Sequence, residues 1–387
     1  MKHTMFIASR LRFRRRIVTV SVAVSYVVMI IAMAVSSGFR NEVRNALSHL
    51  GGDIQLCPSN LNFLDEARPI DAAPSYLPLL ENIVGVESAE PAVYRAGIVK
   101  VGENIQGVML KGVHSPDSVS LSVSIPRRLS EIGGIGVGDK MLTYFVGEKV
   151  KVRNFTVASI YDPVVETDDR LVVYADMKDM QRLNGWSSDQ ASLLEIRMKP
   201  RFRDEATIES AAREAGFIAY SYATDEMGSV FASSMSSRYP QLFDWLDLLD
   251  FNVLFVLVLM MLVAGFNMIS GLLITLFENI STIGVFKAMG MTHKSIAKVF
   301  LVSSASTVLK GMLAGNVAAF VLCLLQDWLH LLKLDPKNYF VSFVPVDINV
   351  VDILSVDLIS FAVIMLLLLI PCSFISRIDP ADSIRVR

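Results

Sequence analysis

Four long runs of apolar residues constrain this chain more than any other feature. Residues 17–39, 251–277 and 358–376 contain no Asp, Glu, Lys or Arg, and residues 299–325 contain only Lys310. A helix needs about 20 mainly apolar residues to cross a bilayer. The Leu, Ile, Val and Phe residues around Lys310 outweigh the insertion cost of one charge. The sequence therefore predicts four transmembrane helices, assigned to residues 17–39, 251–277, 297–325 and 356–376.

The lysines and arginines predict one orientation for all four helices. Residues 1–16 carry six basic and no acidic side chains, which places the N-terminus in the cytoplasm. The first apolar run is too long for a cleavable signal and is expected to remain as an anchor. Residues 40–240 then lie outside, the basic segment 278–296 inside, the acidic loop 326–355 outside and the tail 377–387 inside.

Residues 1–16 mix Met, Phe and Leu with arginines and predict an amphipathic segment at the lipid headgroups. A simple basic stop sequence is the alternative, with the same orientation. The large outer segment, 40–240, alternates β-rich runs with helical runs, which is typical of an α+β domain. Residues 241–277 lack Gly and Pro at their start and predict a stalk helix that continues into the second span.

No pattern of catalytic or metal-binding residues stands out. The cysteines, Cys57, Cys323 and Cys372, lack metal-site or redox spacing, and a structural disulfide is not expected. Residues 133–140, "GGIGVGDK", lack the Gly-Lys-Ser/Thr ending of a phosphate-binding loop. The net charge of −2 gives no indication of nucleic-acid binding. We expect no enzyme activity, metal or cofactor in this chain.

Six segments, taken in order, resemble one family. They are "SSGFRNEVRNALSHLGGDIQL" (36–56), "VGDKMLTYF" with "RNFTVASIYD" (137–162), "YPQLFDWL" (239–246), "ENISTIGVFKAMGMTHKSI" (278–296), "YFVSFVPVDIN" (339–349) and "RIDPADSIRVR" (377–387). Together they resemble the FtsX/MacB-like, type VII ABC-transporter permeases, and most closely the lipoprotein-releasing LolC/LolE type of Gram-negative bacteria. The resemblance covers essentially the whole chain.

The resemblance implies a permease of the bacterial inner membrane with a MacB-like periplasmic domain. It implies ATP-driven extraction of lipoproteins and their transfer to a periplasmic carrier. The implied partners are two copies of a separate ATPase, which binds ATP and Mg, a second permease copy or paralogue, lipoprotein cargo, the carrier and membrane lipid. The terminal Arg387 and the absence of tryptophan in "SYATDEM" (221–227) depart from the family pattern.

Two alternative functions belong to the same superfamily. One is signalling by ATPase motion to cell-wall hydrolases outside the membrane, although the outer domain of about 200 residues is larger than in those permeases. The other is MacB-like export of peptides or small molecules, although such permeases usually carry the ATPase in the same chain.

The segment 278–296 is the predicted coupling helix. Apolar residues recur at helical spacing, Gly290 ends the helix, and Lys287 suits its negative C-terminal end. An apolar ridge can dock into a groove of a partner protein; a helix lying on lipid is the alternative. The predicted ATPase-coupling residues are Glu278, Ile280, Ile283, Phe286, Lys287, Met289 and Gly290. Ile283, Phe286 and Met289 are expected to enter the ATPase, with Glu278 and Lys287 at the rim.

Flexible methionines in the first two spans suit acyl chains of variable shape. The candidate cargo cavity comprises Val28, Met29, Met33, Met260, Met261 and Met268, although these side chains equally suit contact with lipid or other helices. Gly265, Gly271, Gly311 and Gly315 predict close approach of helices. No acidic residue lies within the four apolar runs, so Lys310 is expected to meet a carbonyl, a lipid phosphate or a partner's acid, or else to snorkel.

Overall fold

The structure is a computed structural model that describes residues 15–59, 61, 69–101, 104–114, 120–147, 150–163, 171–222, 230–335, 341 and 343–373. The predicted N-terminal amphipathic segment and the C-terminal tail lie almost entirely outside these ranges. The chain divides into two compact units. We call residues 1–41, 245–333 and 343–387 the membrane unit, and residues 42–244 and 334–342 the α/β unit.

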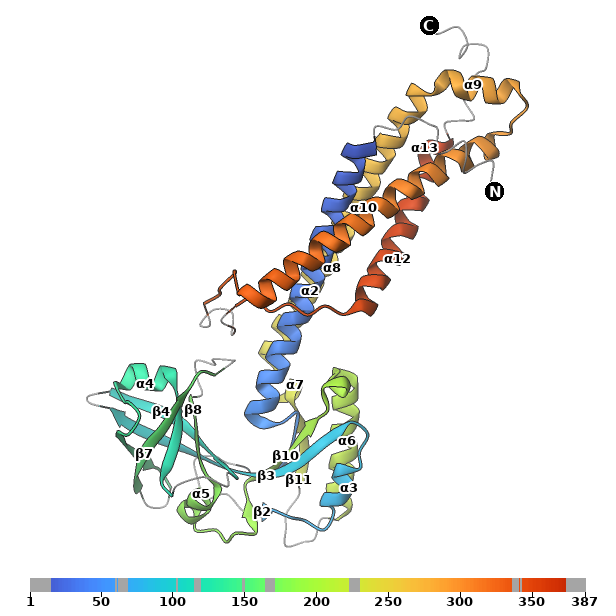
Figure 1. Ribbon diagram of the computed structural model, residues 1–387. Coiled ribbons are helices and arrows are strands. Elements are labelled where there is room, and N and C mark those ends of the chain that lie inside the picture. The colour runs from blue at the N-terminus through green and yellow to red at the C-terminus, as the bar shows by residue number, and fades with distance from the viewer. Residues whose placement is uncertain are drawn as a thin grey trace. The chain divides into compact units, whose positions relative to one another are not determined.

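Four helices of the described chain are long and apolar enough to cross a membrane, which confirms the four predicted spans. They are α2 (Arg15–Gly51), α8 (Pro240–Glu278), α10 (His293–Leu329) and α12 (Val350–Leu367), the last followed by the short α13 (Leu369–Ser373) (Figure 1). Helix α9 (Ile280–Ala288) lies between α8 and α10. Helix α8 is continuous from Pro240, as the predicted stalk requires.

Two helix boundaries differ from the sequence predictions. Helix α10 begins at His293, where Thr292 caps its first turn by accepting a hydrogen bond from the Ser295 amide, so the segment 278–296 includes the start of the third span. Helix α12 begins at Val350, six residues before the predicted span, and contains Asp352 and Asp357. Asp352 was assigned to the outer loop 326–355, whereas Asp357 already lies in the predicted span 356–376.

Glycines bring the membrane helices close together, as predicted. A Cβ atom on Gly311 would lie 2.8 Å from Val22 of α2, and one on Gly315 would lie 2.7 Å from the Ala23 carbonyl oxygen of α2. Gly271 faces α2 in the same way, and Gly265 faces α12. These contacts surround an apolar core that includes Tyr26, Met29, Met268, Phe300 and Ile364.

The α/β unit is built on nine strands in the order β11-β1-β10-β3-β4-β8-β5-β7-β6. The strand bounds are β1 Ile54–Pro58, β3 Val86–Val101, β4 Asn104–Val113, β5 Ser122–Pro126, β6 Lys140–Phe145, β7 Lys151–Tyr161, β8 Leu171–Asp176, β10 Leu193–Met198 and β11 Val230–Ser234. Strands β2 (Ile70–Asp71) and β9 (Gln190–Ala191) form a separate pair. The described helices here are α3 (Leu77–Glu81), α4 (Arg127–Gly133), α5 (Met177–Asn184), the 3-10 helix η1 (Pro200–Phe202), α6 (Glu205–Ser221) and α7 (Met235–Arg238).

Strand β3 pairs with different strands along its 16 residues. Residues 86–92 pair with β10, whereas residues 93–101 pair with β4, and β3 also pairs with β6 through Ile98 and Val99. The β3–β6 pairing closes β3, β4, β8, β5, β7 and β6 into a ring. Gly97 allows the close packing inside it, since a Cβ there would lie 2.9 Å from Thr143 and 3.1 Å from Phe145.

Mixed strands and helices confirm the predicted α+β class. Helix α5 is capped at its C-terminal end by Gly185, which adopts a φ of +78°. Helix α6 continues past Gly216 to Ser221. Gly216 instead packs against Ala232 of β11, so its small size serves helix–strand contact.

Candidate functional site

The C-terminal end of helix α2 lies in the α/β unit and is held by buried cations. The last carbonyl groups of a helix have no partner within it and carry partial negative charge. Here the Lys111 ammonium of β4 donates to the Leu50 carbonyl at 2.8 Å. The Arg238 guanidinium of α7 donates to the carbonyls of Gly51 at 2.9 Å and Gly52 at 2.6 Å. Two elements that are distant in sequence therefore cap one helix.

A buried carboxylate balances one of these cations. Lys111 and Glu195 of β10 form an ion pair of 2.8 Å, with side chains only 2% and 4% exposed. The Tyr94 hydroxyl of β3 donates a hydrogen bond to the second oxygen of Glu195 and lies 3.3 Å from the Leu50 carbonyl oxygen. Burial lowers the pKa of Lys111, and Glu195 opposes that shift. Burial, and then Glu195, raise the pKa of Tyr94, so the phenol remains a donor.

Asp53, two residues after the end of α2, forms hydrogen bonds that hold the end of the helix against neighbouring residues. It is fully buried and accepts hydrogen bonds from the Ser48 hydroxyl at 2.9 Å and the Met198 amide at 2.7 Å. Its own carbonyl accepts from the Met235 amide of α7 at 2.9 Å. We call Asp53, Tyr94, Lys111, Glu195 and Arg238, with the carbonyls of residues 50–52, the helix anchor.

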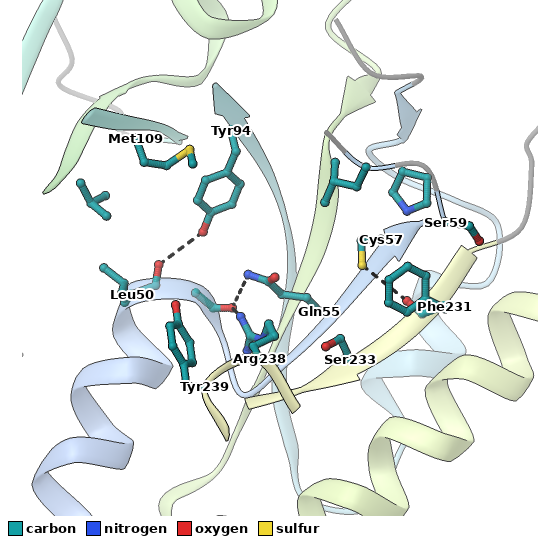
Figure 2. Close-up of a pocket in the computed structure, with 14 residues that line it drawn as sticks. Leu50, Gln55, Cys57, Ser59, Tyr94, Met109, Phe231, Ser233, Arg238 and Tyr239 are labelled. Carbon is teal, nitrogen blue, oxygen red and sulfur yellow. Dashed lines mark hydrogen bonds between the residues drawn. The ribbon is translucent and has the colours of Figure 1, made fainter. Parts of the chain in front are cut away.

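A pocket of about 290 Å³ lies beside the helix anchor (Figure 2). Its wall is mostly apolar, and Figure 2 shows Tyr94, Gln55 and Arg238 at the side nearest the end of α2. The lining residues are Leu50, Gly51, Gln55, Cys57, Pro58, Ser59, Leu61, Tyr94, Met109, Val172, Phe231, Ser233, Arg238 and Tyr239. Burial raises the pKa of Cys57 to about 11, and its thiol donates to the Phe231 carbonyl, so Cys57 is a poor nucleophile.

The predicted coupling residues do not share one exposed face. Ile283 is fully buried in the core of the membrane unit, and Phe286 is half-buried against that core. Both had been expected to contact the ATPase. One side of α9, which includes Ile283, packs on its own helix bundle, and the contact of Ile283 with a partner stays a prediction. Met289 is 76% exposed and Val285 is 49% exposed.

The other predicted coupling residues lie at the ends of the segment or at intermediate depth. Glu278 is exposed and ends α8 rather than α9. Ile280 and Lys287 are half-buried on α9. Gly290 has a φ of +87°, which confirms the predicted glycine stop. Three exposed residues follow one another at intervals of four: Ser281, Val285 and Met289. We call them the exposed stripe of α9.

The residues of the predicted cargo cavity lie at different depths in the helix bundle. Met29 and Met268 are fully buried in the helix core, where they fill space between helices. Val28 and Met33 are half-buried on α2, and Met260 and Met261 are half-buried against the same core. Lys310 is exposed on α10. Exposed apolar side chains on the same helix surround it, including Leu309 and Leu313.

The sequence of this chain is similar to those of known membrane permeases. Residues 254–380 match the family model "FtsX-like permease C-terminal". The chain is 22% identical over 395 residues to the lipoprotein-releasing system transmembrane protein LolC of Xylella fastidiosa strain Temecula1, covering 94% of this chain and 92% of that protein. It is 21% identical over 403 residues to LolC of Neisseria meningitidis, with the same coverage. These similarities support a LolC/LolE-type ABC permease.

Other similarities cover less of the chain. The lipoprotein-releasing system transmembrane protein LolE of Haemophilus influenzae is 26% identical over 170 residues, which is 38% of this chain and 41% of LolE. The periplasmic region of MacB from Actinobacillus actinomycetemcomitans is 13% identical with a TM-score of 0.32, covering 51% of this chain and 95% of that structure. The FtsX-like match and the similarity to LolC support a membrane component of an ABC transporter, and that family implies an ATPase partner.

Proposed function

We propose that this permease extracts lipoproteins from the inner membrane and hands them to a periplasmic carrier. Two copies of a separate ATPase, which bind ATP and Mg, drive it, and a second permease copy or paralogue completes the transporter. The observation that carries the proposal is similarity to lipoprotein-releasing LolC proteins along 94% of the chain. The N- and C-termini lie in the cytoplasm and the α/β unit in the periplasm, since basic residues outnumber acidic ones in the segments 1–16, 278–296 and 377–387.

The helix anchor gives the proposed mechanism a physical route. Helix α2 carries its C-terminal carbonyls into the α/β unit, and Arg238 stands two residues before the start of α8. The same guanidinium therefore links the end of one long helix to the beginning of the other. If the ATPase displaces α2 or α8, the helix anchor would transmit that displacement to the sheet.

Depletion in the source bacterium tests the proposal. After depletion, lipoproteins destined for the outer membrane should accumulate in the inner membrane, and restored expression of the wild-type chain should reverse this. Normal lipoprotein distribution in depleted cells would contradict the proposal. Chains of dividing cells would instead indicate signalling to cell-wall hydrolases. Sensitivity to exported peptides or small molecules would indicate a MacB-like role, which the similarity to the MacB periplasmic region brings into view.

The exposed stripe of α9 is our revised candidate for ATPase contact. Met289→Asp places a charge on the exposed apolar side chain that follows the last residue of α9, and it should weaken copurification of the ATPase and lower release. Met289→Leu keeps the apolar character and similar volume, so it should retain both. Phe286→Asp is less informative, because Phe286 also packs against the helix core. Full copurification and release with Met289→Asp would exclude this face of α9.

A further inference from the structure

Asp357 is an acidic residue buried inside the membrane unit. It lies on α12, its side chain is 7% exposed, and its helix neighbours Leu354 and Leu358 are exposed apolar residues. A carboxylate without a cationic partner is costly in an apolar environment, and such a group is either paired or neutralised. Among the described residues, no Lys, Arg or His forms an ion pair with Asp357.

The groups that face Asp357 are neutral hydrogen-bonding side chains from three helices. The Asn316 amide of α10 donates to Oδ2 of Asp357 at 2.6 Å. The Ser360 hydroxyl donates to the Asp357 carbonyl at 3.1 Å and shares a hydrogen bond of 2.8 Å with the Tyr26 hydroxyl of α2. Tyr26 is the only one of these three neighbours that can ionise, and its hydroxyl is already engaged with Ser360.

Two buried oxygen atoms in this cluster lack a hydrogen-bond donor. Oδ1 of Asp357 and Oδ1 of Asn316 are both buried, and neither has a hydrogen-bond partner. Both are acceptors, so an ionised carboxylate leaves two buried acceptors and no donor for either. Buried polar groups are nearly always hydrogen-bonded, and an orphaned one destabilises the fold. One added proton would supply the missing donor for both atoms at once.

We propose that Asp357 is a proton-binding site in the transmembrane bundle. The proton, taken from water, sits on Oδ1 and the resulting hydroxyl donates to Oδ1 of Asn316, while the Asn316 amide donates to Oδ2. The neutral acid and the amide then form two hydrogen bonds side by side, and both orphaned oxygens are satisfied. The pair joins α10 to α12 without burying a net charge.

The site links two helices beside an apolar cavity. Asn316 also lines an apolar cavity of about 270 Å³ together with Ile30 of α2 and Ile353 of α12. The protonated pair therefore bridges two helices beside this cavity, close to where Ser360 contacts Tyr26 of a third helix. An ionised Asp357 would need a cation here, and the described residues provide none in contact.

Infrared difference spectroscopy tests the protonation state directly. The full-length permease, in complex with its ATPase in lipid nanodiscs at neutral pH, is compared with Asp357→Asn. The wild-type protein should show a carbonyl band of a protonated carboxylic acid that is absent from Asp357→Asn and shifts in D₂O. Asn316→Leu should shift the same band, because the acid loses its partner. Asp352→Asn, on the same helix but half-exposed, should remove only carboxylate bands. Loss of carboxylate bands alone in Asp357→Asn would overturn the proposal.

Thermal unfolding of the same complexes provides a second readout. Asp357→Asn copies the neutral acid, so its melting temperature should stay within about 2 °C of the wild type. Asn316→Leu and Asp357→Leu each orphan a buried group and should lower it by about 5 °C. If a metal ion or a cationic side chain of a partner neutralises Asp357 instead, Asp357→Asn should destabilise the complex as much as Asp357→Leu, and that result would refute the proposal.

Discussion

At the scale of single residues, the helix anchor depends on charges that are buried and mutually paired. Lys111 has two partners, the Glu195 carboxylate and the Leu50 carbonyl, both at 2.8 Å. Removing one member of a buried ion pair leaves the other charge unpaired, which costs far more than the pair contributes. The helix anchor is therefore the part of the α/β unit most sensitive to single substitutions of polar residues.

Lys111→Met should destabilise the protein by about 3 to 5 kcal/mol, because Glu195 is left charged and buried. Thermal unfolding of the full-length protein measures the loss. The double variant Lys111→Met with Glu195→Leu should recover much of it, since neither charge remains. Arg127→Met breaks the exposed pair with Asp162 and serves as a control that should change little. Equal losses in the single and double variants would show that the ion pair is not the cause.

Cys57 should react slowly with thiol reagents. A pKa of about 11 leaves so little thiolate at pH 8 that labelling should be about 200-fold slower than for an ordinary cysteine. The measurement uses the Cys323→Ser, Cys372→Ser background, in which Cys57 is the remaining thiol. Labelling should become fast in denaturant. Rapid labelling of the folded protein would show that the pocket opens far more than the structure indicates.

The helix anchor could not be predicted from the sequence, for a physical reason. Tyr94 and Lys111 are cross-strand partners in the β3–β4 register, and Glu195 comes from β10 on the other part of β3. Their contact depends on strand register, which a single sequence does not specify. Asp357 lies within the predicted span 356–376, but its pairing with Asn316 depends on how α10 packs against α12, which a single sequence does not specify.

At the scale of elements, close packing of α10 on α2 depends on glycine. Gly315→Leu should lower the melting temperature of the full-length protein by about 5 °C or more, because its side chain would enter the α2 backbone near Ala23. Ala318→Leu, at an exposed position of α10, is the matched control and should have little effect. Similar melting temperatures for both variants would indicate that α2 and α10 separate easily.

The faces of α9 show the limit of helical periodicity as evidence. Apolar residues occur all around this short helix, so spacing alone could not distinguish the side that packs on α8, α10 and their neighbours from the side that faces outward. The buried side includes Ile283, and the exposed side includes Val285 and Met289. The glycine stop was predictable, because Gly290 needs a positive φ that few other residues adopt.

At the scale of the whole molecule, the four spans and the α+β unit were predictable because long apolar runs and alternating β-rich and helical segments are strong local signals. The closure of β3 with β6 was not, since it joins segments more than 40 residues apart and no short pattern encodes it. The parallel pairings β4–β8 and β5–β7 were missed for the same reason.

The proposed mechanism makes a prediction for the complete transporter. Arg238→Gln removes the cation between the end of α2 and the start of α8, so lipoprotein release in reconstituted membranes should fall while the ATPase still binds and hydrolyses ATP. Arg182→Gln, on the exposed side of α5, is the control and should retain release. Release at the wild-type rate by Arg238→Gln would show that force does not pass through the helix anchor.

Strand β3 has one further consequence, for how the α/β unit unfolds. The same backbone supplies hydrogen bonds to β10 in residues 86–92 and to β4 and β6 in residues 93–101, so neither half of the unit keeps its ladder if β3 detaches. Amides of β4 and of β10 should therefore exchange with deuterium through the same opening event, at closely similar free energies. The ring and the open part of the sheet therefore form one cooperative folding unit. They are not two domains joined at the middle of β3.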